Sequence, residues 1–317
     1  MGNGLIATLG SLVTERYWQL RRGAPPAPPT WRPDPRLLEV SEFEWPSRYA
    51  RAPAEKWMVH VHIGLSDWVP VRRKMLSQDY SGIALARLLV DGRAYEIAFD
   101  YSDYPIINEE CARRVAVYFK MQHPVGGFPG SSNVYPGGFV PASPMIYGAL
   151  SSLRRLRERG EFHWDVYARF GLEAGVEIRS RALALLTDQT SFRFLGGAGR
   201  VRYSQYLREA AAAQVCIDLP GNGDLCFRLI DYLAVGACVV AVQPRNRLHV
   251  LLEDRIHVAY VRPDLSDLLS TCEYYLKHPD ERERLSRNAR DFFDRYLHSR
   301  QLAGYYLQTA FEHLKLA

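Results

Sequence analysis

Residues 215–242 read VCIDLPGNGDLCFRLIDYLAVGACVVAV, and this stretch decides the predicted fold. A short run of β-type residues ends at a turn of sequence PGNG, residues 220–223. Asp224 is placed to cap a helix whose apolar residues recur at helical spacing and which ends at Gly236. The run 238–242 then reads as a fully buried parallel strand. The stretch therefore predicts a strand, a glycine-rich turn, a helix and a second strand.

The start of this helix has the features of an anion-binding site. A helix that begins behind a glycine turn, here with Gly221, Gly223 and Asp224, presents unpaired backbone N–H groups and a partial positive charge. Arg228 lies in the first turns and can direct two N–H groups at phosphate oxygens. Asp231 shares its face and can accept hydrogen bonds from ribose hydroxyls. The alternative is that Arg228 and Asp231 form a solvated ion pair on an ordinary helix.

The second half of the chain alternates strands and helices. From about residue 160, strand patterns alternate with helical patterns, the strands at 162–170, 191–195 and 257–261 and the helices at 177–187, 203–213 and 265–277. Such alternation predicts an α/β domain with a doubly wound parallel sheet, whose ligands bind at the carboxyl ends of the strands. Arg169 ends the first of these strands, and Arg179 and Arg181 begin the next helix. These arginines either form surface ion pairs or help to balance the charge of a bound anion.

The first half is less regular and has three candidate strands, at 57–64, 94–99 and 114–121. Asp100, Asp103 and Lys120 lie at or near the ends of two of these runs. His60 and His62 alternate along the first run and would share a face of that strand. Because no third ligand lies nearby and the two aspartates have the spacing DxxD, we predict no metal site.

Composition is that of an ordinary globular chain. The 317 residues are 47% hydrophobic and 24% charged, which allows two domains of about 100–150 residues each. No apolar run approaches the roughly 20 residues of a membrane helix, and residues 1–23 are a poor signal peptide. The five cysteines are odd in number and lack CxxC spacing, so we expect buried thiols in a reducing cytoplasm.

The net charge of +5 is modest and spread along the chain. The densest basic cluster, SSLRRLRERG at residues 151–160, reads as a solvated helix face. A nucleic-acid footprint needs a larger one-sided basic patch, so no nucleic-acid partner is expected.

Residues 215–242 resemble the donor-nucleotide segment of GT-B glycosyltransferases, most closely the exostosin-like and spore-coat-type branches. In those branches a glycine-rich turn precedes Phe-Arg, an acidic residue and a Gly-Cys-x-Val-Val run. The matching residues here are Phe227-Arg228, Asp231 and 236–240. The resemblance is specific over residues 160–300 and thin over 45–145. Two positions that are usually Glu in such enzymes are Gly223 and Asp231 here, which leaves inversion or retention of the anomeric configuration open.

The resemblance implies a GT-B-like fold with two Rossmann-like domains and a cleft between them. Its implied divisions are an N-terminal helix with a proline-rich linker (1–44), an acceptor-side domain (45–145), a nucleotide-sugar-binding domain (146–300), and a C-terminal helix (301–317) crossing back to the acceptor-side domain. The implied activity is a cytoplasmic, metal-independent, hexosyltransferase-like reaction without a cofactor. Its donor would be a nucleotide diphosphate sugar, with a UDP-sugar as the first candidate. Its acceptor is not identified.

The resemblance also implies roles for single residues. Arg228 would contact the donor diphosphate and Asp231 the ribose, at the turn of Gly221, Gly223 and Asp224. Arg169 and Lys120 would add positive charge, as such enzymes place basic groups near the donor phosphates. Because the first half faces the acceptor in a GT-B enzyme, Asp100, Asp103 or His62 would accept the acceptor's proton. Turn or capping roles for both aspartates stay open.

Two other functions are compatible with parts of this pattern. A non-catalytic nucleotide-sugar-binding relative, acting as a binding or scaffold protein, would also carry the glycine turn and Arg228. A dinucleotide-dependent oxidoreductase has less support, because no strand leads into GxGxxG.

Overall fold

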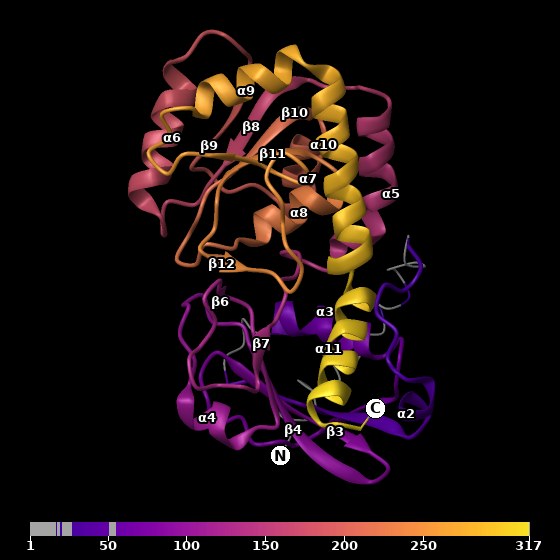
Figure 1. Ribbon diagram of the computed structural model, residues 1–317. Coiled ribbons are helices and arrows are strands. Elements are labelled where there is room, and N and C mark those ends of the chain that lie inside the picture. Colours follow the sequence, from indigo (N-terminus) through magenta and orange to yellow (C-terminus); the bar gives the residue numbers. More distant parts are fainter. Residues whose placement is uncertain (1–16, 18–19, 21–26, 51–54, 317) are drawn as a thin grey trace, which may run out of the picture. The chain divides into compact units, whose positions relative to one another are not determined.

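The computed structural model describes residues 17, 20, 27–50 and 55–316 (Figure 1). Most of the N-terminal helix expected within residues 1–44, and the start of the proline-rich linker after it, lie outside the described residues. In the described part of the chain, every helix is too short or too polar to span a bilayer.

The chain divides into two compact units, which are described separately. The first unit contains Met1–Gly148, Arg247–Val250 and Asp294–Ala317. The second unit contains Ala149–Asn246 and Leu251–Phe293.

The second unit is built on a five-stranded parallel sheet with the order β13-β11-β10-β8-β9. Its strands are β8 (Trp164–Arg169), β9 (Phe194–Gly197), β10 (Ala213–Asp218), β11 (Cys238–Val242) and β13 (Ala259–Val261). Its helices are α6 (Val176–Asp188), α7 (Tyr203–Ala211), α8 (Phe227–Val235), α9 (Leu268–Lys277), α10 (Pro279–Phe292) and most of α5 (Met145–Glu158). A short strand, β12 (Asn246–Arg247), and a π-helical turn, Phe293–Leu297, lie at the boundaries between the units.

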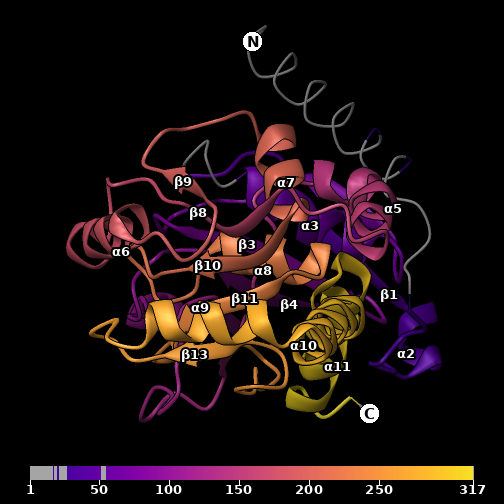
Figure 2. The same cartoon turned by 90° about the horizontal axis from the view of Figure 1, so that it is seen from above.

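Helices cover both faces of this sheet. Helices α6 and α9 pack on one face, and Figure 2 shows α9 alongside β13. Helices α7 and α8 pack on the other. Numbered along the chain, the strands stand in the order 2-1-3-4-5, so the direction of winding reverses between β8 and β10. Ligands of doubly wound sheets bind at the carboxyl ends of the strands at such a switch point. The α/β class and the parallel sheet expected for this half are confirmed.

The first unit has a six-stranded mixed sheet with the order β2-β1-β3-β4-β5-β7. Its strands are β1 (Ser41–Pro46), β2 (Val71–Lys74), β3 (Ile83–Val90), β4 (Arg93–Asp100), β5 (Val117–Lys120), β7 (Val134–Pro136) and the short β6 (His123–Pro124). Its helices are α2 (Pro35–Glu39), α3 (Glu55–Leu65), α4 (Glu109–Arg114) and α11 (Ser299–His313).

This mixed sheet differs from the expected Rossmann-like sheet. Strands β3 and β4 form an antiparallel hairpin closed by Asp91 and Gly92, whose φ values are +48° and +76°. Positive φ at both central residues is typical of the tight turn that matches strand twist. The Asp-Gly pair was the sequence signal for this hairpin, and the pattern of the flanking runs alone did not reveal it.

Residues 57–64, expected as a strand, lie in helix α3. Met58, Val61 and Leu65 are buried, and so are the residues between them, which leaves no polar face to display a helical period. A short apolar run fits a strand and a buried helix equally well. In the structure these residues pack as a helix against α11. His60 and His62 are therefore two residues apart on a helix and do not share a face.

Helix α8 ends where the sequence predicted but begins later. Gly236 closes it with φ of +79°, a left-handed conformation that favours glycine. Its N-cap is Cys226 and not Asp224. Helix α9 likewise begins at Leu268, after its N-cap Asp267, and not at Leu265.

Helices α3 and α11 approach each other closely at Gly64. A Cβ at this position would lie 2.2 Å from the carbonyl oxygen of Ser299 and 3.1 Å from the Cβ of Ala303. Only glycine allows the two backbones this approach.

We predict that Gly64→Ala lowers the free energy of unfolding by about 1–3 kcal/mol, because α3 and α11 must move apart. Urea unfolding followed by tryptophan fluorescence measures the change. Gly126→Ala is the control, since its Cβ would meet nothing within 4 Å. Equal unfolding midpoints for the two variants would show that the close approach is absent in solution.

Candidate functional site

The candidate site lies in the second unit at the switch point between β8 and β10. These strands end at Arg169 and Asp218. The loop of residues 219–226 follows β10 and leads into α8. The side chains of Arg179, Asp218 and Arg228 form a charged cluster next to this loop.

Arg228 bridges the ends of the two strands. Its Nη2 donates to the carbonyl of Leu219 at 2.8 Å and its Nη1 to the carbonyl of Arg169 at 3.4 Å. Its Nε forms an ion pair with Asp218 Oδ1 at 2.9 Å. The guanidinium carbon lies 4.8 Å from the ring centroid of Phe170. Arg228 is thus held by the backbone and by Asp218, and the alternative of an exposed pair with Asp231 is wrong.

Asp218 was not singled out from the sequence. It is 3% exposed, and burial raises the pKa of its carboxyl although Arg228 and Arg179 oppose the shift. The sequence signal that could have indicated Asp218 was a charged residue at the end of a mostly apolar strand.

Arg179, in the first turn of α6, brings a second buried guanidinium to the same place. It is 6% exposed, and its Nη1 and Nη2 donate to the carbonyls of Gly171 at 2.7 Å and Leu219 at 3.3 Å. Its Nε is buried and has no hydrogen-bond partner in the described structure. Burial, and next the charge of Arg228, lower the pKa of Arg179.

The buried guanidinium of Arg179 and the largely buried one of Arg228 therefore face a single buried carboxylate, that of Asp218, which is paired with Arg228. A buried charge without compensation is costly. A bound anion would supply the missing negative charge and an acceptor for the Nε of Arg179. The cluster is chemically suited to hold an anion.

Two glycines lie where the loops around the cluster approach their neighbours closely. A Cβ on Gly221 would lie 3.0 Å from Arg179 Nη2, and one on Gly175 would lie 2.4 Å from the carbonyl oxygen of Pro220. Gly175 has φ of +61° and is the N-cap of α6, as Cys226 is of α8. No side-chain hydrogen bond caps either helix in the described structure, and the positive end of a helix dipole favours a bound anion.

Three of the predicted donor-binding residues have other partners in the structure. Asp231 is 1% exposed and accepts a hydrogen bond from the hydroxyl of Tyr203 at 2.8 Å. Asp224 forms an ion pair with Arg245 at 3.0 Å and fixes the loop 219–226 to the segment after β11. The guanidinium of Arg169 turns towards Glu209 on α7, at 3.2 Å. Through these contacts, none of the three side chains reaches Arg179 or Arg228.

The first unit contains a second polar cluster, at the carboxyl ends of β4 and β5. Lys120 is fully buried, and its Nζ forms an ion pair with Asp100 Oδ1 at 3.0 Å and donates to Ser102 Oγ at 2.6 Å. The hydroxyl of Tyr118 donates to Asp100 Oδ2 at 2.6 Å. Burial lowers the pKa of Lys120, although Asp100 opposes the shift. Asp100 thus serves to compensate a buried cation.

Asp103 and His62 differ in their suitability as bases. Asp103 is only partly buried, and burial raises the pKa of its carboxyl against the opposing charge of Lys120. His62 is 9% exposed and lies with its ring edge-on to Trp45, 5.8 Å between centroids. Burial lowers the pKa of His62 to about 4, so it is a weak base. Asp103 is the better candidate of the two.

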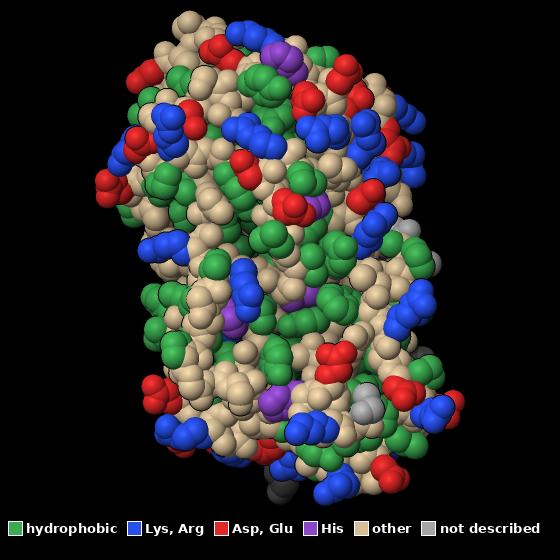
Figure 3. All heavy atoms as spheres, viewed as in Figure 1, with side chains coloured by type: hydrophobic (Ala, Val, Ile, Leu, Met, Phe, Trp, Pro, Cys, Tyr) green, Lys and Arg blue, Asp and Glu red, His purple; other side chains and the backbone are tan. Residues whose placement is uncertain are grey.

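In the described part of the chain, no group of three or more His, Cys, Asp or Glu side chains is arranged to hold a metal ion. On the face drawn in Figure 3, Lys and Arg side chains are interspersed with Asp and Glu.

We predict that Lys120→Met destabilises the protein by about 3–5 kcal/mol, because it leaves Asp100 buried without a counter-charge. Adding Asp100→Asn should recover part of this loss. Arg87→Met is the control, since its ion pair with Glu44 is half exposed and its loss should cost less than about 1 kcal/mol. Chemical denaturation of the four proteins checks the order. Equal losses for Lys120→Met and Arg87→Met would contradict the buried pair.

Residues 179–308 match the model of a family described as glycosyl transferase-like. No curated protein matches the chain. The matched segment begins at Arg179 and contains Asp218, Arg228 and the glycine loop between them. It covers about two fifths of the chain and supports a glycosyltransferase family. Part of the chain is thus similar to a glycosyl transferase-like family.

Proposed function

We propose that the protein is a metal-independent glycosyltransferase of the GT-B type, close to the exostosin-like and spore-coat-type branches. It takes a sugar from a nucleotide diphosphate donor, with UDP-sugars first among the candidates. The observation that carries this proposal is the buried pair Arg179 and Arg228 beneath the glycine loop, inside the glycosyl transferase-like segment.

The cluster has the chemistry that a departing nucleoside diphosphate requires. Negative charge develops on the diphosphate as the glycosidic bond breaks, and fixed cations stabilise it without reorganisation. Arg228 cannot swing away from the site because Asp218 and two carbonyls hold it. Arg179 keeps its Nε available. In this proposal Arg179 contacts the phosphate and Arg228 contributes charge from beneath the loop.

The remaining predicted residues take supporting roles in the proposal. Gly221 and Gly223 let the loop approach the diphosphate, and Asp224 fixes that loop through Arg245. Asp231 holds α7 against α8 near the ribose position, through Tyr203. In the first unit, Asp103 accepts the acceptor's proton, and Asp100 and Lys120 hold the ends of β4 and β5 together.

We predict that Arg179→Gln weakens binding of UDP by about ten- to a hundredfold, the value of one charge-assisted hydrogen bond. Binding of uridine, which has no phosphate, should change little. Isothermal titration with UDP, GDP, dTDP and ADP identifies the preferred base first, and the variant is then titrated with that nucleotide.

The matched control is Arg181→Gln, on the same helix turn but exposed and paired with Glu177. It should retain affinity within about threefold. Asp218→Asn removes the only buried carboxylate of the cluster and should preserve or strengthen diphosphate binding while lowering stability. Normal UDP affinity in a folded Arg179→Gln variant would overturn the proposed site.

We also predict that donor binding and sugar transfer persist in EDTA. Two guanidinium groups and two uncapped helix N-termini supply the positive charge that a metal ion supplies elsewhere. Transfer assays with and without the chelator check this. Activity lost in EDTA and restored by manganese or magnesium would contradict metal independence.

The second candidate function is a nucleotide-sugar-binding protein without turnover. Its support is that Asp231 is buried against Tyr203 and that Gly223 replaces the glutamate of many relatives. Donor hydrolysis and transfer assays separate the two functions. UDP binding without measurable hydrolysis or transfer, across a panel of sugars and acceptors, would favour this candidate.

A further inference from the structure

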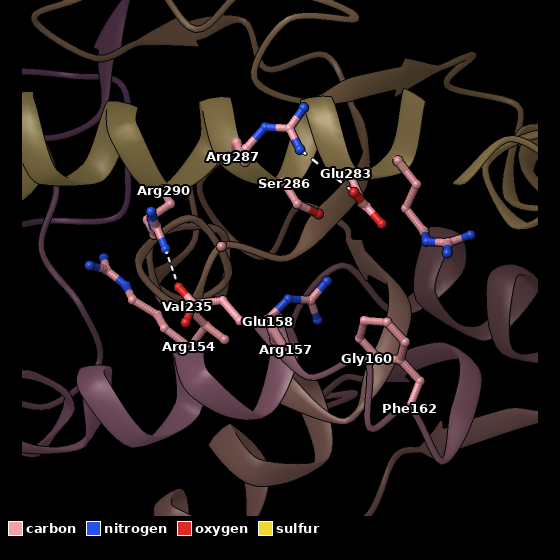
Figure 4. Close-up of a pocket in the computed structure, with 12 residues that line it drawn as sticks. Arg154, Arg157, Glu158, Gly160, Phe162, Val235, Glu283, Ser286, Arg287 and Arg290 are labelled. Atoms are coloured by element: carbon pink, nitrogen blue, oxygen red, sulfur yellow. Dashed lines mark hydrogen bonds and ion pairs between the residues drawn. The ribbon is translucent and has the colours of Figure 1, made fainter. Parts of the chain in front are cut away.

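The second unit contains another basic pocket, at the carboxyl end of α8 (Figure 4). It has a volume of about 350 Å³ and is walled by the end of α5, the turn after it, the end of α8 and one face of α10. Since α8 has nine residues, its two ends are about 13 Å apart. The pocket is therefore separate from the glycine loop, which lies at the other end of this helix.

The charge of the pocket is strongly positive. Five arginines and two glutamates line it, which gives a formal charge of +3, and the arginines are Arg154, Arg157, Arg282, Arg287 and Arg290. In Figure 4, Arg290 points to Glu158 and Arg287 to Glu283. Both glutamates are thus already paired.

Arg154 and Arg157 do not form the solvated helix face expected from residues 151–160. The Nε and Nη2 of Arg154 donate to the carbonyl of Ala234, at 2.9 and 2.7 Å, near the end of α8. Nη1 of Arg157 donates to the carbonyls at and just after the end of α7, those of Ala213 at 2.7 Å, Ala210 at 3.3 Å and Ala211 at 3.4 Å. These arginines point inwards because helix carboxyl ends need donors.

Arg157 and Arg282 have no carboxylate partner among the described residues. Nη1 of Arg282 donates to the carbonyl of Tyr275 at 2.8 Å, at the end of α9. The guanidinium of Arg157 stacks on Phe162, 5.2 Å from its ring centroid. Burial lowers the pKa of Arg157, and the charge of Arg282 acts in the same direction. Two guanidinium groups without a carboxylate partner therefore line the same pocket.

Helix dipoles do not cancel this charge. The carboxyl ends of α5, α7, α8 and α9 contribute about −0.5 each, which still leaves an excess of about one positive charge. Ser286 lies on α10 between Arg282 and Arg290 at four-residue spacing, and its buried Oγ has no hydrogen-bond partner in the described structure. The pocket thus combines excess positive charge with an unused hydroxyl.

We propose that this pocket binds a small oxyanion of the phosphate class, either free phosphate or the phosphate group of a monoester. In the described structure, Arg157 and Arg282 donate hydrogen bonds through Nη1, and each guanidinium has further N–H donors on Nε and Nη2. Ser286 donates its hydroxyl to the same ligand. The pocket volume of about 350 Å³ is large enough for a phosphate with a small organic group. Glu283 and Glu158, paired with Arg287 and Arg290, line the same pocket and restrict the ligand to a small anion.

The test is titration of the full-length protein with inorganic phosphate at constant ionic strength. Phosphorus NMR line broadening and thermal shift both report binding. We expect saturable binding that Ser286→Ala weakens about fivefold, through loss of one hydrogen bond. Ser286→Asp should weaken it at least about tenfold, because it places a carboxylate in the ligand's position. Glycerol phosphate in place of phosphate shows whether a monoester binds more tightly.

Two controls separate this pocket from other sites. Arg284→Gln lies on α10, pairs with Glu281 and does not line the pocket, so it should bind phosphate normally. The titration is repeated in the Arg179→Gln background, which removes phosphate binding beneath the glycine loop, and the binding that depends on Ser286 should remain. Since Ser286→Ala removes one buried atom group only, it keeps the test valid if Ser286→Asp fails to fold.

The proposal is overturned by the absence of saturable binding at phosphate concentrations of up to about 20 mM, well above the millimolar affinity of a weak site. Equal affinity in wild type and both Ser286 variants would overturn it too. So would an equal loss in Arg284→Gln, or abolition of binding by Arg179→Gln. Displacement of phosphate by a hexaglutamate peptide of higher affinity would assign the pocket to an acidic protein segment instead.

Discussion

The ion pair of Arg228 with Asp218 is the interaction on which the candidate site depends. It lies where the winding of the sheet reverses, and it connects the end of β8 with the end of β10 through two carbonyls and one carboxylate. An arginine there would cost several kcal/mol if it were buried alone. Asp218 compensates its charge, and Arg179 then adds a second cation that has no buried carboxylate of its own. The result is an excess of positive charge beneath the glycine loop, which is what a diphosphate requires.

Arginine has a different task at the two ends of α8. At the start of the helix, Arg228 and Arg179 lie near the carboxylate of Asp218 and near two helix N-termini that no side chain caps. At its end, Arg154 and Arg157 satisfy the carbonyls of helix carboxyl ends. Arg179 keeps its Nε without a hydrogen-bond partner in the described structure, because one guanidinium has more donors than one or two carbonyls can use. In the two proposals above, the same residue type both stabilises the fold and binds an anion.

The first unit shows the opposite balance. Lys120 and Asp100 compensate each other in a buried pair through Oδ1, to which the backbone N–H of Ser102 also donates, and the hydroxyl of Tyr118 donates to Oδ2. Such a pair stabilises little relative to an apolar substitute, but loss of one partner is costly. Asp103, in contrast, is only partly buried, and burial raises the pKa of its carboxyl.

The sequence by itself determined the α/β class of the second half, the strand β11, the end of α8 at Gly236 and the positions of Arg228 and Arg179. These follow from local chemistry: alternating apolar periods, a glycine in left-handed conformation and a cation behind a glycine turn. Tertiary structure alone decided that residues 55–65 form a helix, since residues 58–65 are all buried and so show no helical period of polar residues. It also decided that Arg228 pairs with Asp218 and not with Asp231, and that Arg157 points inwards. Which charges meet depends on strand order and helix packing, and a one-dimensional pattern does not contain that information.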